Sequence, residues 1–161
     1  MALVADANVA DWRRHFEVNL FSCVSLTQAT LPLLRESRGK VIAVSSGAAR
    51  SPLAGWSAYS CGKAALNMFV ECLAREEKEI TSIAVRPGMV DTAMQLKVRE
   101  EGKDVMGPDH NKFADTHSAG KLLLPQVPAE VIVNLAERAP QDWSGLYLSW
   151  DDERVKLAFQ G

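Results

Sequence analysis

A run of apolar residues that ends in two serines constrains the fold of this chain most strongly. The predicted strand covers residues 40–46 and finishes in Ser45 and Ser46. A loop with Pro52 and Gly55 follows and leads into a helical pattern. A strand that is apolar throughout is typical of a parallel sheet covered on both faces. Open α/β sheets bind ligands at the carboxyl ends of their strands, so the two hydroxyl groups are expected at a ligand-binding edge.

Tyr59 and Lys63 lie four residues apart in the helix predicted over about residues 57–78. Side chains at this spacing share one face of a helix. An ammonium group beside a phenol favours the phenolate, so we expect the pKa of Tyr59 to lie below its usual value of about 10. Such a phenol can exchange a proton near neutral pH, with Ser46 in reach to hold a substrate oxygen.

The joint pattern resembles the active site of the short-chain dehydrogenase/reductase family, a serine followed about a dozen residues later by Y-x-x-x-K. Tyr59 follows Ser46 by 13 residues. Downstream, residues 86–92 (R-P-G-M-V-D-T) resemble the family's P-G-x-V-x-T turn, and Asn19 lies in a predicted helix where the family carries a catalytic asparagine. Residues 145–150 (G-L-Y-L-S-W) resemble the last strand of fungal reductases of this family.

The resemblance implies an NAD(P)-dependent oxidoreductase, of the carbonyl reductase or alcohol dehydrogenase type, that acts on a small carbonyl or alcohol. Tyr59 would be the general acid/base, Lys63 would depress its pKa and bind the cofactor ribose, and Ser46 would hold the carbonyl oxygen. Asn19 would anchor a water that leads to the lysine. The residues implied in binding NAD or NADP are Tyr59, Lys63, Pro87, Gly88, Val90 and Thr92.

The remaining pattern predicts one domain, 1–161, with an α/β fold. Its Rossmann-like, three-layer αβα architecture would contain a parallel sheet. Further elements are expected in residues 8–34 (a helix capped by Asn8 and kinked or ended by Pro32), 81–86 (strand), 128–138 (helix) and 145–150 (strand). Residues 94–113 are predicted to form a mobile polar flap. His110 and His117 are predicted to be surface residues. The tail, residues 151–161, is expected to be weakly ordered.

Composition narrows the functional classes. A net charge of -2 argues against nucleic-acid or membrane-surface binding. No apolar run is long enough to cross a bilayer, and the first residues do not resemble a signal peptide. Three cysteines without metal-ligand spacing are expected to be free thiols in a reducing compartment. We therefore expect a cytoplasmic protein with no metal site.

The family resemblance covers only the last strands of a seven-stranded domain, so the first strands are expected to be missing. The chain has no T-G-x-x-x-G-x-G turn to hold a pyrophosphate. Cofactor binding should therefore be weakened. This leaves two alternatives open: a cofactor-independent acid/base enzyme (an isomerase, cyclase or dehydratase) that reuses the Ser-Tyr-Lys site, or a non-catalytic partner of a full-length reductase.

Assembly is expected from two features of the sequence. Leu66 and Val70 lie off the main apolar stripe of the second helix, which predicts burial on more than one side. The shortened sheet would also expose the edge of its first strand. We therefore expect a homo-oligomer, or a hetero-oligomer with a related reductase.

Overall fold

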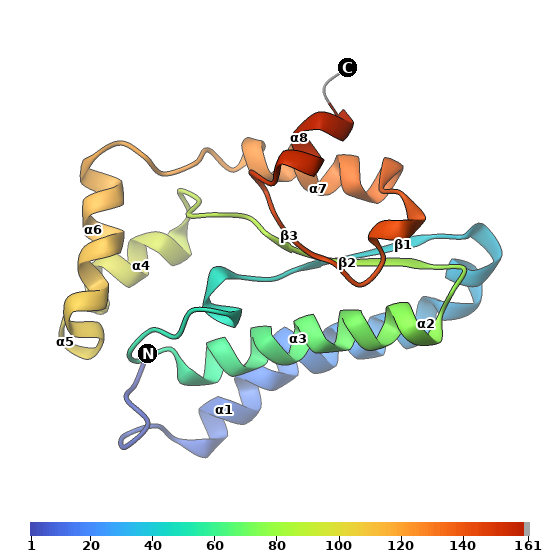
Figure 1. Ribbon diagram of the computed structural model, residues 1–161. Helices are drawn as coiled ribbons and strands as arrows, with labels where there is room; N and C mark the ends of the chain where they lie inside the picture. The colour runs from blue at the N-terminus through green and yellow to red at the C-terminus, as the bar shows by residue number, and fades with distance from the viewer. Residues whose placement is uncertain (160–161) are drawn as a thin grey trace.

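The computed structural model describes residues 1–159, which form a three-stranded parallel sheet between two helical layers (Figure 1). The strands are β1 (Lys40–Val44), β2 (Thr81–Arg86) and β3 (Tyr147–Ser149), in the order β1-β2-β3. Ile42 pairs with Ile83, and Val85 pairs in turn with Leu148. The predicted α/β fold with a parallel sheet is confirmed, although β1 stops two residues before Ser46.

One layer contains the helices that precede and follow β1. The helix predicted at the start of the chain begins with α1 (Val9–Phe16). The Asn8 side chain caps its first turn, as expected. The helix passes through the π-helical turn η1 (Glu17–Phe21) into α2 (Ser22–Ser37). α3 (Ser57–Glu76) packs beside them under the sheet (Figure 1). α2 continues past Pro32, so the proline does not end the helix, and it stops only where Arg38 adopts a left-handed conformation.

The opposite face of the sheet is covered by α7 (Gln126–Arg138) and α8 (Glu153–Phe159) (Figure 1). The short 3-10 turn η4 (Gln141–Trp143) connects α7 to the last strand. The tail was expected to be weakly ordered, and that expectation is wrong for residues 153–159. Val155 of α8 is fully buried in the core beside Leu135 and Leu148, which explains why this segment forms a helix. Residues 160–161 of the predicted tail lie outside the described residues.

The side chains of β2 decide which layer packs on which face. Ile83 and Val85 belong to the core cluster under α7 and α8, whereas Ala84 packs with Leu66 and Val70 of α3. Ser82 also faces α3 and donates a 2.9 Å hydrogen bond to the Val70 carbonyl. Alternate side chains of a strand point to opposite faces, so Ser82 and Ala84 share the face that meets α3. Because both are small, α3 can lie close to the strand.

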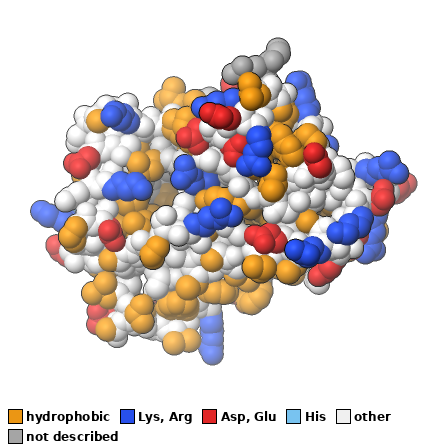
Figure 2. All heavy atoms as spheres, viewed as in Figure 1, with side chains coloured by type: hydrophobic (Ala, Val, Ile, Leu, Met, Phe, Trp, Pro, Cys, Tyr) orange, Lys and Arg blue, Asp and Glu red, His pale blue; other side chains and the backbone are white. Residues whose placement is uncertain are grey.

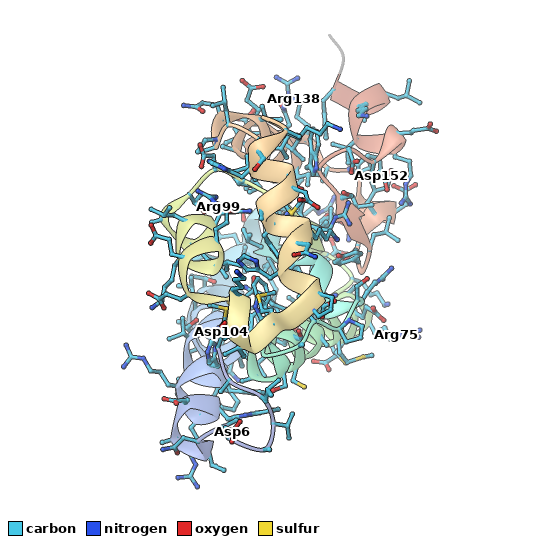
Figure 3. The ribbon with its side chains drawn as sticks, turned by 90° about the vertical axis from the view of Figure 1, so that its left-hand side faces the viewer. Asp6, Arg75, Arg99, Asp104, Arg138 and Asp152 are labelled. Carbon is cyan, nitrogen blue, oxygen red and sulfur yellow. The ribbon has the colours of Figure 1, made fainter. Side chains whose placement is uncertain are left out.

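Residues 93–118 form a helical lobe at the carboxyl end of the sheet, where a mobile flap was expected over residues 94–113. The lobe comprises α4 (Ala93–Glu101), α5 (Lys103–Met106), the 3-10 turn η3 (Gly107–His110) and α6 (Asn111–Ser118). Figure 3, which labels Arg99 and Asp104, shows these helices in front of the sheet. Val98, Met106 and Phe113 bury against Trp56, so scattered apolar residues in a polar stretch suffice to order it.

His110 was expected at the surface, and this too is wrong. Its ring is buried, and Nε2 donates a 2.9 Å hydrogen bond to the backbone carbonyl of Arg99. The bond joins η3 to α4 and helps to hold the lobe together. His117 is exposed, as predicted.

Candidate active site

Ser46 lies two residues after the end of β1 and caps the short 3-10 turn η2 (Gly47–Ala49). Its hydroxyl oxygen accepts a 3.1 Å hydrogen bond from the backbone N–H of Ala48. The Tyr147 hydroxyl donates a 3.0 Å bond to the Ser46 carbonyl from β3. Ser45 points instead into the protein, where its hydroxyl donates a 2.6 Å bond to the Asn67 side chain. Both serines border the same cavity, but the buried Ser45 hydroxyl is engaged by Asn67, whereas Ser46 is only half-buried.

Tyr59 and Lys63 lie on one face of the first turns of α3, as their spacing predicts. Both side chains line the same cavity as Ser46. The Lys63 ammonium lies 5.8 Å from the centroid of the Tyr59 ring. It donates a 2.9 Å hydrogen bond to the Val44 carbonyl, the last of β1. This bond fixes the lysine between the strand and the phenol.

The electrostatics of Tyr59 differ from the sequence-based expectation. Burial raises the pKa of the phenol above its usual value, and a hydrogen bond with the Ser46 side chain opposes this only in part. The expected lowering is wrong, because burial disfavours the charged phenolate more than the hydrogen bond with Ser46 favours it. Tyr59 is therefore protonated at neutral pH.

Lys63 is itself perturbed by its surroundings. Burial lowers the pKa of its ammonium, and the nearby Cys23 thiol partly opposes the shift. Cys23 is half-buried and belongs to α2, one turn beyond Asn19. Cys23, Cys61 and Cys72 all carry free thiols.

Asn19 is brought to the cavity by the π-helical turn. Its amide nitrogen donates a 3.0 Å hydrogen bond to the His15 carbonyl, so the side chain is partly satisfied by backbone. A Cβ atom at Gly62 would lie only 3.6 Å from that of Asn19, which shows how closely α3 approaches this turn. π-Helical turns within α-helices occur frequently at functional sites. Asn19 faces the cavity between the helices and not the core.

The turn after β2 forms the opposite wall of the cavity. Gly88 has φ +83°, and a Cβ atom there would lie 2.5 Å from the Trp150 indole nitrogen. Val90 forms a parallel bridge with Leu123, a residue that no motif in the sequence indicates. Thr92 caps α4, where its hydroxyl accepts a 3.4 Å hydrogen bond from Gln95 N–H. Pro87, Gly88, Val90 and Thr92 all line the cavity with Ser46 and Tyr59.

An aromatic wall, which no sequence motif indicates, closes the remaining side of the cavity. The Trp56 ring packs edge-on against Tyr59 with centroids 5.2 Å apart, and it lies 5.4 Å from the Phe113 ring. Leu53 and Met89 pack on the same cluster. Trp56, three residues before Tyr59, is a signal in the sequence, but nothing there indicates that Phe113 meets it.

The cavity has a volume of about 660 Å³. Figure 2 shows hydrophobic side chains in the recess between the lobe and the carboxyl end of the sheet. A second cavity of about 620 Å³ lies between the first residues, α1 and α4, and shares Asn19, Trp56 and Tyr59 with the first. Tyr59 thus lies where two cavities adjoin.

Two further structural findings concern residues 1–159 alone. Nowhere in this range do three or more His, Cys, Asp or Glu side chains gather as a metal site would require. Each helix in the same range is too short or too polar to cross a membrane.

A family model described as short chain dehydrogenase matches residues 1–103. An uncharacterized oxidoreductase of Schizosaccharomyces pombe is 41% identical over 152 residues, which cover 93% of this chain and 62% of the relative. A benzil reductase of Saccharomyces cerevisiae, described as (S)-benzoin forming, is 41% identical over 94% of this chain and 60% of its own length.

The fold agrees with these relationships. A crystal structure of a Saccharomyces cerevisiae short-chain dehydrogenase/reductase superposes with a TM-score of 0.93 at 36% identity, covering 98% of this chain and 63% of that one. This chain therefore spans about 60% of the length of the curated relatives that it matches.

Proposed function

Since the chain belongs to the short-chain dehydrogenase/reductase family, we propose that it carries the catalytic site of an NAD(P)-dependent carbonyl reductase. The reverse reaction would be an alcohol oxidation. The observation that carries this proposal is the convergence of Asn19, Ser46, Tyr59 and Lys63 on one cavity whose far wall is the turn after β2.

The backbone of Val90 supports a nicotinamide site. Leu123 N–H donates to the Met89 carbonyl at 2.9 Å, and Asp91 N–H donates to the Leu123 carbonyl at 2.8 Å. Successive peptide groups of an extended chain alternate in direction, so Val90 N–H points away from Leu123. This N–H is suited to bind the carboxamide of a nicotinamide, with Pro87, Gly88 and Thr92 beside the ring and Tyr59 and Lys63 toward the ribose.

The cofactor, when bound, supplies a hydride to the carbonyl carbon. Tyr59 supplies the matching proton: its O–H bond breaks as a new O–H bond forms on the substrate oxygen. Burial keeps the phenol protonated until that oxygen gains charge. Ser46 is held by Ala48 N–H in a position to bind the same oxygen. Lys63 would return a proton from its ammonium to the phenolate, and would itself be reprotonated through a water that Asn19 anchors.

The walls of the cavity support aromatic ketones as substrates. Aromatic and aliphatic side chains pack around Tyr59 in the lining of this cavity, namely Trp56, Phe113, Leu53 and Met89. Aromatic rings bind well in such surroundings, through burial of apolar area and edge-to-face contact. One relative of similar sequence is a benzil reductase, so benzil is the substrate with which to begin.

The proposal is tested with the purified chain, benzil, and NADPH or NADH. We expect oxidation of the reduced cofactor that depends on benzil, and calorimetric binding of at least one cofactor. Tyr59→Phe should lower turnover by roughly 10²–10⁴-fold while the circular dichroism spectrum is unchanged, since only a hydroxyl is removed. Turnover of the variant at the wild-type rate would remove Tyr59 from the mechanism. Failure of both cofactors to bind would overturn the reductase proposal for this chain.

A further inference from the structure

The turn that carries Ser46 has little of its own to hold it in place. η2 consists of Gly47, Ala48 and Ala49, of which only Ala48 is buried. Hydrogen bonds in a 3-10 turn have poorer geometry than those of an α-helix, and these three residues offer almost no side chain for packing. The position of the Ser46 hydroxyl therefore depends on contacts from outside the turn.

The start of the turn is held by Tyr147, which comes from the far strand of the sheet. The Tyr147 hydroxyl donates a 3.0 Å hydrogen bond to the Ser46 carbonyl, 101 residues away in the sequence. The same carbonyl accepts a 3.1 Å bond from the N–H of Ala49. The Ser46 peptide is thus fixed both from within the turn and from β3.

Two alanines leave space for the Tyr147 ring to reach Ser46 across β2. Ala84 pairs with Tyr147 on one side and with Ala43 on the other. Residues paired in this way point to one face of a sheet, and the three side chains pack in the cluster against α3. Because both alanines are small, the ring can extend over them toward the end of β1.

The end of the turn is held by the same tyrosine. Arg50 follows η2 directly, and its N–H donates a 3.0 Å hydrogen bond to the Gly47 carbonyl. The Arg50 guanidinium lies over the Tyr147 ring, 4.1 Å from its centroid. A cation in this position is attracted by the face of the ring. One side chain therefore contacts the residues that flank η2 on both sides.

Both contacts are made on the side of the turn away from the cavity. The cavity wall includes Ser46 and the first residues of η2. Within the described residues, neither Tyr147 nor Arg50 belongs to that wall. The Ser46 side chain bonds the Ala48 N–H and Tyr59. Any effect of Tyr147 on the reaction is therefore transmitted through the turn.

We propose that Tyr147, together with Arg50, is a positioning residue that holds Ser46 in place for the reaction. This inference rests on the proposed reductase function and deepens it. The Tyr147 hydroxyl fixes the Ser46 carbonyl, and the Tyr147 ring fixes Arg50 at the other end of the turn. The Ser46 hydroxyl then keeps its place beside Tyr59. Loss of either contact lets the turn move and weakens the bond from Ser46 to the substrate oxygen.

Amide hydrogen exchange, followed by NMR on the purified chain, tests the hold on the turn without any substrate. The amides of Ala48 and Ala49 both donate to Ser46 and report on its position. Tyr147→Phe keeps the ring and removes only the hydroxyl. It should speed the exchange of these two amides roughly three- to tenfold, the scale of one lost hydrogen bond.

Two further variants complete the exchange experiment. Arg50→Gln removes the cation from the ring and should speed the exchange of the Ser51 amide, which donates to Gly47, roughly two- to fivefold. Ser82→Ala is the matched control, because its hydroxyl also donates to a backbone carbonyl, that of Val70, but away from the turn. It should leave exchange in η2 at the wild-type rate.

Turnover with benzil and NADPH shows whether the reaction depends on this positioning. Tyr147→Phe should lower kcat roughly three- to tenfold with KM nearly unchanged, because Ser46 binds the oxygen more strongly as that oxygen gains charge. In a Ser46→Ala background the same substitution should have no further effect, since no hydroxyl remains to be positioned. A general loosening of the fold would lower kcat in both backgrounds.

The outcomes separate this inference from the proposed function. Wild-type exchange of the Ala48 and Ala49 amides in Tyr147→Phe overturns the inference and leaves the reductase proposal intact. An equal loss of kcat in both backgrounds also overturns it, because Tyr147 would then act independently of Ser46. If the wild type reduces no ketone, the reductase proposal fails, and faster exchange in Tyr147→Phe still supports the hold of Tyr147 on the turn.

Discussion

The Lys63 ammonium donates a 2.9 Å hydrogen bond to the Val44 carbonyl at the end of β1. One bond therefore connects the helix that carries the phenol to the strand that leads into Ser46. Lys63 therefore joins α3 to β1 through this hydrogen bond, in addition to placing a positive charge in the cavity. Its burial between the strand and α3 also accounts for the lowered pKa of its ammonium.

Replacing Lys63 by methionine should affect both activity and stability. The variant keeps most of the aliphatic volume but leaves the Val44 carbonyl without this donor. We expect a loss of stability of roughly 0.5–1.5 kcal/mol, the usual net contribution of one hydrogen bond, because Val44 is partly open to solvent. Turnover should fall because the proton-return path and the ribose contact are lost. Lys63→Arg is the control that retains the charge. Wild-type turnover in Lys63→Met would contradict the assignment.

The raised pKa of Tyr59 predicts a dependence of stability on alkaline pH. A raised folded-state pKa means that the unfolded chain loses the phenolic proton first, so this contribution to stability is complete below about pH 10. It is lost as the pH rises through the folded-state pKa. The contribution of Lys63 to stability changes with pH in the opposite direction, because the folded-state pKa of its ammonium is lowered.

Denaturant unfolding at about pH 9 and about pH 11 measures the effect. Tyr59→Phe should lose less stability over this interval than the wild type, since it has no phenol to ionise. Tyr147→Phe removes another phenol whose pKa is raised by burial and shows how much of the slope belongs to each tyrosine. An identical slope for the wild type and Tyr59→Phe would argue against a buried, protonated phenol.

Gly88→Ala should destabilise the chain and distort the proposed nicotinamide wall. The residue has φ +83°, and a Cβ atom would meet the Trp150 indole and the Leu123 side chain within 2.5–2.7 Å. Backbone strain alone is worth about 1–3 kcal/mol, and the collision adds to it. Gly120→Ala is the control, because φ is +63° there and nothing lies within 4 Å of the new Cβ. Thermal unfolding should show a larger decrease for Gly88→Ala, and equal decreases would exclude the steric contribution.

Assembly is predicted from the apolar side chains that the helical layer exposes. Leu26 and Leu33 of α2 are each 67% exposed, and Met68 of α3 is 57% exposed. Figure 2 shows hydrophobic side chains along the lower side of the molecule, over α1 to α3. Contiguous patches of this kind typically mark interaction surfaces.

Light scattering should therefore give a mass above the 17.6 kDa of one chain. Leu26→Glu with Leu33→Glu should shift the protein toward the monomer, because two charges are placed in the expected interface. Val133→Glu, on α7 at 54% exposure, is a control on the opposite layer. A wild-type monomer at micromolar concentration would refute the prediction.

The sequence predicted the elements whose pattern is local. β2 begins and ends at the residues that the apolar run indicated, and the sharing of one helix face by Tyr59 and Lys63 follows from helical geometry alone. The order Ser46, Tyr59, Lys63 therefore identified the cavity before any contact was known. The helices within residues 94–113 were not predicted, because their few apolar residues stabilise helices only by packing on Trp56, which is distant in the chain.

The tertiary structure decided what depends on distant partners. The direction of the Tyr59 pKa shift follows from burial by groups that the helical lobe brings to the cavity, and the motif alone suggested the opposite direction. The hydrogen bond from Tyr147 to Ser46, and the pairing of Leu123 with Val90, exist only once separate segments meet. Periodicity and spacing in the sequence fix which residues share a strand or a helix face. How far a group is buried, and which hydrogen-bond partners it has, depend on all the segments packed around it. Burial and hydrogen bonding in turn decide the chemistry of the site.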